Sequence, residues 1–198
     1  MIEVDLSRHK PVVLITDVQE LFTAAEGPFE NTTSGPLLEA LDAFLRACRA
    51  LAVPVVFSNY VVRDDRLDAG LLREAPWVVA GHMGAGSPWV RVDRRLERAP
   101  SDVEVPHNRP SAFFRSDLDA VLAGLGADAL VLCGLSVNNA ISATARDAFA
   151  RDLPTIVVRE CTGAAPWETE HDTYFEILAT WTAEVASAEN VLARLRAA

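Results

Sequence analysis

The chain has 198 residues, of which 50% are hydrophobic and 23% are charged, and its formal net charge at pH 7 is −10. This apolar content excludes a disordered chain, and the length fits one domain over residues 1–198. An acidic surface repels phosphate backbones and anionic headgroups, so we expect a small-molecule substrate, and neither nucleic acid nor membrane as a partner.

The cysteine content and the hydropathy indicate the compartment. Cys48, Cys133 and Cys161 are too few and too scattered for a disulfide framework, and an odd number leaves one thiol unpaired. No apolar run approaches the roughly 18 residues of a membrane span, and no secretory start is present. We therefore expect a cytoplasmic protein.

The first half of the chain contains two predicted strands around one amphipathic helix. Pro11–Thr16 and Pro54–Ser58 are mainly apolar runs of strand length, and Leu37–Leu51 carries apolar residues at helical spacing. Residues 60–100 hold much of the Gly, Pro and Trp. This composition predicts loops with short helical turns and no separate domain.

The second half alternates short strands with helices. The predicted strands are Val103–Val105, Ala129–Cys133, Thr155–Val158 and Glu184–Ala186. One predicted helix begins at Ser116 and stops near Gly126, a second covers 139–151, and a third covers Glu168–Trp181. A fourth follows a cap at Ser187. Apolar strands that alternate with helices predict a three-layer α/β/α fold, in which helices cover both faces of a six-stranded, mostly parallel sheet.

Polar residues follow several of these strands. Asp17, Asn59 and His107 stand at strand ends, and Gly134–Ala140 is a strand-to-helix turn. Ligands of open parallel sheets bind beyond the carboxyl ends of the strands, so these residues should meet at one rim. There Asp17 and His107 can carry protons, and backbone N–H groups of the turn can hold a developing negative charge. The alternatives are a turn carboxylate, a structural histidine and a turn without a catalytic role.

Three segments, taken in order, resemble the isochorismatase-like hydrolase superfamily, which includes nicotinamidases, N-carbamoylsarcosine amidases and isochorismatases. They are Asp17-Val18-Gln19 with Phe22 beyond, Ser111-Ala112-Phe113 followed by Ser116-Asp117-Leu118, and Cys133-Gly134 followed by Thr144-Ala145-Arg146-Asp147-Ala148. The resemblance runs from about residue 10 to 190. It implies the family's Rossmann-like fold, a hydrolase activity and a homodimer or homotetramer. No organic cofactor is implied, since no Gly-rich phosphate loop follows the first strand.

Two catalytic positions depart from the family. The resemblance places Asp17 on the general base, His107 on the lysine and Ala140 on the nucleophilic cysteine. Alanine has no nucleophilic atom, so the family's thioester route cannot operate in this chain. The resemblance also implies a cis peptide bond between Leu135 and Ser136, and an anion site made by the N–H groups of Ser136 and Ala140.

The resemblance also bears on metal and substrate binding. A nicotinamidase metal site requires an Asp and two His after the second strand, where this chain has Asn59-Tyr60-Val61-Val62-Arg63-Asp64-Asp65, so we expect no metal. The candidates for substrate binding are Phe22, Asn59, Arg63, Trp77, Phe113 and Trp167. For Arg63, Trp77 and Trp167, surface or core roles are the alternative.

Ala140 leaves three interpretations open. In the first, the chain hydrolyses a vinyl ether or C–N bond of a small carboxylated or amide metabolite by Asp/His acid–base chemistry, and it resembles the 2-amino-2-deoxyisochorismate hydrolases, which lack the cysteine. In the second, Ala140 is an engineered replacement of a natural cysteine in an amidase. In the third, the chain is a non-catalytic protein that binds a small molecule. All three place the ligand at the same rim.

Overall fold

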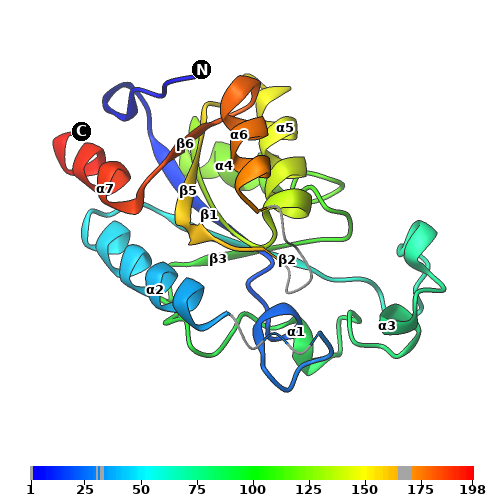
Figure 1. Ribbon diagram of the computed structural model, residues 1–198. Coiled ribbons are helices and arrows are strands. Elements are labelled where there is room, and N and C mark those ends of the chain that lie inside the picture. The colour runs from blue at the N-terminus through cyan, green and yellow to red at the C-terminus, as the bar shows by residue number, and fades with distance from the viewer. Residues whose placement is uncertain (1, 30, 32–33, 165–170) are drawn as a thin grey trace.

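A six-stranded sheet forms the centre of the fold (Figure 1). In the computed structural model, which describes residues 2–29, 31, 34–164 and 171–198, the strand order is β3-β2-β1-β4-β5-β6, and every neighbouring pair is parallel. The strands are β1 (Pro11–Thr16), β2 (Val55–Tyr60), β3 (Val103–His107), β4 (Ala129–Gly134), β5 (Thr155–Thr162) and β6 (Glu184–Ala186). The predicted α/β sheet is confirmed, and it is parallel throughout.

Helices cover both faces of this sheet. One face carries α2 (Gly35–Ala50) and α7 (Ala188–Ala197), and the other carries α4 (Leu118–Leu125), α5 (Ser142–Phe149) and α6 (His171–Trp181) (Figure 1). Val13 and Ile15 of β1 belong to the cluster beneath α2, whereas Val12 and Leu14 belong to the cluster beneath α4. Alternate strand residues point to opposite faces, so a strand covered on both faces is apolar at every position.

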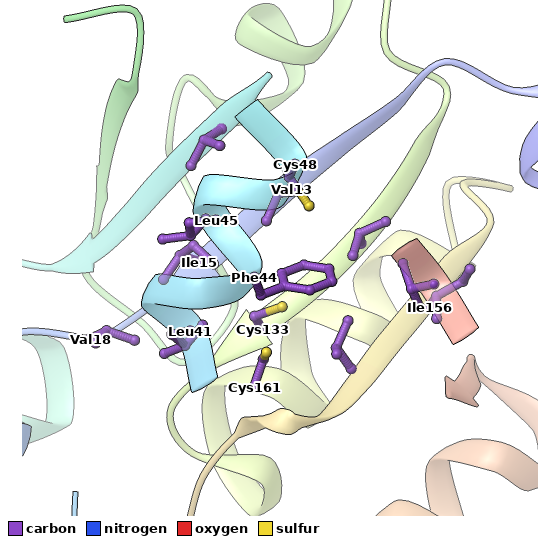
Figure 2. Close-up of a cluster of buried hydrophobic side chains, with 14 of the residues drawn as sticks. Val13, Ile15, Val18, Leu41, Phe44, Leu45, Cys48, Cys133, Ile156 and Cys161 are labelled. Atoms are coloured by element: carbon purple, nitrogen blue, oxygen red, sulfur yellow. The ribbon is translucent and has the colours of Figure 1, made fainter. Parts of the chain in front are cut away.

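Figure 2 shows the cluster beneath α2. Leu41, Phe44, Leu45 and Cys48 lie three or four residues apart along the helix, which places them on the face that packs against the sheet. Cys133 from β4 and Cys161 from β5 lie in the same cluster (Figure 2). All three cysteines are free and fully buried, at 0% exposure. They act as small apolar core residues.

Several elements differ from their predicted limits. The strand predicted to end at Ser58 continues to Tyr60, and β3 continues to His107, because Tyr60 and His107 pair with each other beyond the apolar runs. The helix predicted over 139–151 begins only at Ser142, because Val137–Ile141 forms a π-helical turn before it. Where a helix was predicted over Glu168–Trp181, α6 covers His171–Trp181; residues 168–170 lie outside the described ranges.

Two predicted helix ends are observed, one at Gly126 and one at Ser187. Gly126 follows α4 in the left-handed conformation, with a φ of 64°. The Ser187 hydroxyl accepts a hydrogen bond from the Asn190 N–H at 3.2 Å and caps α7. At the other end of α4, the helix begins at Leu118, whose N–H donates to the Ser116 hydroxyl at 3.3 Å. None of the helices in the described ranges combines the length and hydropathy that crossing a bilayer requires.

Short elements gather beyond the carboxyl ends of the central strands (Figure 1). They are α1 (Glu20–Thr23), η2 (Gly70–Leu72), α3 (Pro76–Val79) and η3 (Pro88–Val90), while η1 (Leu6–Arg8) precedes β1. Gln19 ties this region to the sheet: its side-chain nitrogen donates to the carbonyl oxygens of Tyr60 and Val90, at 3.1 and 2.8 Å, and its oxygen accepts from the Tyr60 N–H at 2.8 Å. This fully paired amide fixes Tyr60 at the end of β2.

Candidate active site

A cavity of about 280 Å³ lies beyond the ends of β1 and β4. These two strands are neighbours at the point where the strand order changes direction, which is where open α/β sheets bind ligands. The residues that line it are Asp17, Phe22, Phe29, Asn31, Tyr60, Leu72, Trp77, Met83, Leu135, Ser136 and Asn139. The lining therefore joins the end of β1, the turn after β4 and the short elements that cover the sheet edge.

Asp17 leaves β1 in an unusual backbone conformation. Its φ is 56°, in the left-handed region that Asp and Asn tolerate better than other side chains. Its N–H donates to the Ser58 carbonyl oxygen at 2.9 Å. Its carboxylate oxygen Oδ1 lies 2.9 Å from His107 Nε2, and no described residue donates a hydrogen bond to Oδ2. Asp17 lines the cavity, so Oδ2 is the carboxylate oxygen left for a hydrogen bond with a ligand there.

His107 stands at the end of β3 with its side chain fully buried. Its Nδ1 lies 2.5 Å from the Arg109 carbonyl oxygen, and Nε2 faces Asp17. A carbonyl oxygen can only accept, so Nδ1 carries a proton and donates it. Arg109 is itself held in place, because its Nη1 donates to the Asp68 carbonyl oxygen at 2.9 Å and Asn108 Nδ2 donates to Asp68 Oδ2 at 3.0 Å.

The Asp17–His107 contact holds one further proton. Since Nδ1 is already protonated, a hydrogen bond between Nε2 and Oδ1 joins either an imidazolium to a carboxylate or a neutral imidazole to a carboxylic acid. The pair is electrically neutral in both forms. It therefore stores one transferable proton at the wall of the cavity, which is the requirement for general acid–base chemistry.

The charge of Asp17 favours the protonated ring. Burial of His107 works to lower its pKa, but the Asp17 charge and hydrogen bond, together with the carbonyl oxygens of Arg109 and Ser58, outweigh burial and raise it above the usual 6.5. A raised folded-state pKa stabilises the fold in full below the unfolded pKa, and this stabilisation is lost as the pH rises through the folded-state pKa.

The raised pKa of His107 predicts how the stability of the fold changes with pH. The free energy of unfolding of the wild-type chain should exceed that of a His107→Gln variant most at pH 6, and the difference should shrink as the pH rises to 9. Urea denaturation of both proteins at unit steps of pH measures it. A difference that stays constant or grows with pH would show that the folded-state pKa of His107 is not raised.

The turn after β4 supplies the third part of the site. The peptide bond between Leu135 and Ser136 is cis, at the position that the family resemblance implies. The Leu135 N–H donates to the Thr16 carbonyl oxygen, and the Val137 N–H donates to that of Gly163, both at 2.9 Å. No described residue accepts a hydrogen bond from the Ser136 N–H. This donor borders the cavity and is available to a developing anion.

The structure brings four of the predicted residues to the cavity. Asp17, Phe22, Trp77 and Ser136 line it, and His107 lies directly behind Asp17. Ala140 is buried, with 1% exposure, directly after the cavity residue Asn139.

Three predicted residues lie away from this cavity. Asn59 borders a separate hollow beside Val90, because it alternates with Ser58 and Tyr60 along β2 and points to the opposite face. Arg63 lies at the surface and pairs with Asp65, at 2.5 Å between nitrogen and oxygen. Phe113 is buried in the α4 core, with the Arg151 guanidinium 4.3 Å from its ring centre. Trp167 lies outside the described residues.

Several cavity residues escaped the sequence analysis. Tyr60 carries a usable signal, because it stands where β2 ends at the binding edge of the sheet. Its ring also meets His107 edge to face, with 5.3 Å between ring centres. Leu72 belongs to the three-residue element η2, and Phe29 and Met83 come from irregular segments. None of these stretches is long enough to show periodicity, so nothing in the sequence pattern marks the three residues. Among the described residues, no group of three or more His, Cys, Asp or Glu side chains is arranged to hold a metal ion.

The chain is similar to known proteins of one family. A family model described as the isochorismatase domain matches residues 11–190. A maleamate amidohydrolase of Pseudomonas putida is 28% identical over 95% of this chain and 88% of its own length. An N-carbamoylsarcosine amidase of an Arthrobacter species is 26% identical over 78% of this chain, which spans only 60% of that relative. A ureidoacrylate amidohydrolase of Pseudomonas savastanoi is 25% identical over 80% of this chain and 74% of its own length.

Solved structures share the fold. A cysteine hydrolase from Pseudomonas syringae pv. phaseolicola superposes with a TM-score of 0.91 at 23% identity, covering 100% of this chain and 97% of that one. An N-carbamoylsarcosine amidase from Thermoplasma acidophilum gives a TM-score of 0.74 at 22% identity, covering 91% and 97%. With a family model that spans nearly the whole chain, the protein belongs to the isochorismatase family of hydrolases.

Proposed function

We propose that this chain hydrolyses a C–N bond of a small molecule by proton transfer through the Asp17–His107 pair, without a covalent thiol intermediate. One observation carries the proposal. Because His107 Nδ1 is committed to the Arg109 carbonyl oxygen, the 2.9 Å contact between Nε2 and Asp17 holds a single proton beside the cavity. The names of the relatives, which are amidases and amidohydrolases, support a C–N bond as the target.

The proposed reaction begins with water. A water molecule in the cavity attacks the amide carbonyl carbon while the Asp17 carboxylate accepts one of its protons, and the carbonyl oxygen becomes an anion. The free Ser136 N–H stabilises that anion, and one such donor is typically worth roughly 10²–10³-fold in kcat. Asp17 then gives its proton to the leaving nitrogen, the C–N bond breaks, and a carboxylic acid and an amine are released. The imidazolium of His107 neutralises the Asp17 carboxylate before and after the reaction, and it offsets the substrate anion while Asp17 holds the proton.

No described thiol replaces the missing nucleophile. Position 140 is alanine, and Cys48, Cys133 and Cys161 lie in the core cluster beneath α2 (Figure 2). Burial raises the pKa of Cys48 to about 12 and the pKa of Cys133 well above its usual range. Thiols in this state are inert, because the thiolate is the nucleophile.

A thiol test separates this proposal from its alternatives. The chain, offered a panel of small amides and vinyl ethers, should turn over at least one compound, and acid-quenched protein should show no mass adduct. Iodoacetamide treatment of the folded protein should leave the rate unchanged. An Ala140→Cys variant should be alkylated if its thiol reaches the cavity, which provides the positive control.

Each other outcome contradicts the proposal in a recognisable way. Turnover by Ala140→Cys alone would favour a cysteine enzyme whose nucleophile has been replaced. Binding seen as a thermal shift, with no turnover by either protein, would favour a non-catalytic binding protein. Turnover that is lost on alkylation would assign the chemistry to one of the buried thiols.

A further inference from the structure

We propose that the Asp17 cavity selects an uncharged substrate whose larger part is flat and apolar, and that it rejects carboxylates. This inference rests on the proposed function only in its use of the same cavity. Seven of the eleven lining residues are apolar or aromatic. The remaining four are Asp17, Asn31, Ser136 and Asn139. The lining therefore combines a few hydrogen-bonding groups with a surface that is otherwise hydrophobic.

Among the described residues, no positively charged side chain lines the cavity. The described lining residues include no Lys, Arg or His, and Asp17 is their one acidic side chain. The residues that the structure does not describe are 1, 30, 32–33 and 165–170, and their sequence contains no Lys, Arg or His. Those residues therefore add no Lys, Arg or His side chain to the lining.

Two cations that contact the lining residues Asp17 and Tyr60 are committed elsewhere. His107 is fully buried behind Asp17, and its charge is balanced by that carboxylate. Arg109 lies beside Tyr60 and opposes the rise that burial causes in the pKa of the Tyr60 hydroxyl. Its Nη1 donates to the Asp68 carbonyl oxygen at 2.9 Å, and Arg109 is not part of the lining. A carboxylate in the cavity would therefore lose its hydration without gaining a counter-ion, which is costly.

Aromatic rings form one wall of the cavity. Phe22 and Phe29 stack with 5.4 Å between ring centres and 20° between planes, and Trp77 meets Phe29 at 5.9 Å. All three rings are only partly buried, so they retain surface to cover a ligand. A volume of about 280 Å³ lies just below the usual range of roughly 300–1,000 Å³ for ligand pockets, so the ligand is small. A flat apolar group against this wall places its polar end near Asp17 and Ser136.

The relatives provide a contrast. Maleamate, ureidoacrylate and N-carbamoylsarcosine, named in the descriptions of three relatives, are each carboxylic acids that also carry an amide or a urea group. The cavity described above has no side chain that would pair with their carboxylates. We therefore expect the substrate of this chain to be an uncharged amide, in contrast to the carboxylates named for these relatives.

Binding of matched ligands tests the inference without any need for turnover. Phenylacetamide and phenylacetate have the same ring and differ in one group, and calorimetry at pH 7.5 gives Kd for both. We expect phenylacetamide to bind the 198-residue chain at least tenfold more tightly. Acetamide, which lacks the ring, should bind more weakly than phenylacetamide by at least the same factor.

Two neighbouring variants identify the cavity as the cause. Leu72 lines the cavity, whereas the Leu71 side chain next to it is fully exposed. Leu72→Arg should lower the tenfold preference for the amide to parity or reverse it, and Leu71→Arg, which adds the same charge outside, should leave the preference unchanged. If Leu72→Arg fails to fold, the wild-type comparison of amide with carboxylate decides alone.

Several results would overturn the inference. They are phenylacetate binding as tightly as phenylacetamide, equal shifts in Leu71→Arg and Leu72→Arg, or no binding of either ligand at millimolar concentration. Selective binding of the amide without hydrolysis of any compound would leave the charge selectivity in place and remove the proposed activity. Hydrolysis of carboxylated amides only, dependent on Asp17, would keep the proposed activity and remove the selectivity.

Discussion

Replacing Asp17 by asparagine is expected to lower kcat/KM by roughly 10²–10⁴-fold, which is the usual contribution of a general acid or base. Asparagine tolerates the left-handed backbone conformation at this position, where φ is 56°. Its amide can still donate to His107 Nε2, while Nδ1 remains bonded to the Arg109 carbonyl oxygen. The variant therefore keeps the geometry and loses the transferable proton.

Steady-state kinetics on a compound from the substrate panel measures this loss. Asp117→Asn is the matched control, because Asp117 is exposed and precedes α4, away from the cavity. Unfolding by urea should show Asp17→Asn to be folded, so that the loss belongs to chemistry. Equal kcat/KM values for Asp17→Asn and the wild-type chain would remove Asp17 from the reaction.

Replacing Gly134 by alanine is expected to cost about 4 kcal/mol or more of unfolding free energy, which few single substitutions reach. Gly134 has a φ of 118°, a conformation that side chains rarely adopt. A Cβ there would collide with the Thr16 carbonyl oxygen and lie 2.7 Å from the Thr16 nitrogen. Both atoms belong to the backbone of β1, so neither can move without disturbing the centre of the sheet.

Gly124→Ala is the matched control for this substitution. Gly124 lies within α4, and a Cβ built there meets nothing within 4 Å. Alanine is the better helix former, so this variant should be equally stable or more stable by about 0.5–1 kcal/mol. Urea denaturation of both variants decides the point, and a Gly134→Ala protein within 1 kcal/mol of the wild-type chain would show that the close approach to Thr16 is not needed.

The sequence predicts the sheet well because its strands are buried on both faces. The limits predicted for β1 are those observed, since the five residues after the half-buried Pro11 are all buried. The limits of β5 differ, because the strand continues past Val158 through the exposed Arg159 and Glu160 to Thr162. Such polar residues pair through the backbone alone, which hydrophobic patterning does not detect.

The site is predictable where it follows from strand ends and not where it follows from loops. Asp17 directly follows β1 and His107 ends β3, and a parallel sheet brings such positions to one edge. Phe29 and Met83 reach the cavity only through the packing of irregular segments. Arg63 illustrates the converse: a charged residue after a strand looks available to a ligand, but Asp65 lies two residues away and pairs with it. The homo-oligomer and the cytoplasmic location stay predictions.

A crystal structure of the Asp17→Asn variant with phenylacetamide bound tests the central claim most directly. The predicted complex has the amide group within about 2.6–3.2 Å of the side chain at position 17. The amide carbonyl oxygen should accept from the Ser136 N–H, and the ring should lie against Phe22, Phe29 and Trp77. An amide group out of reach of position 17, or a ligand seated in another hollow, would contradict the account.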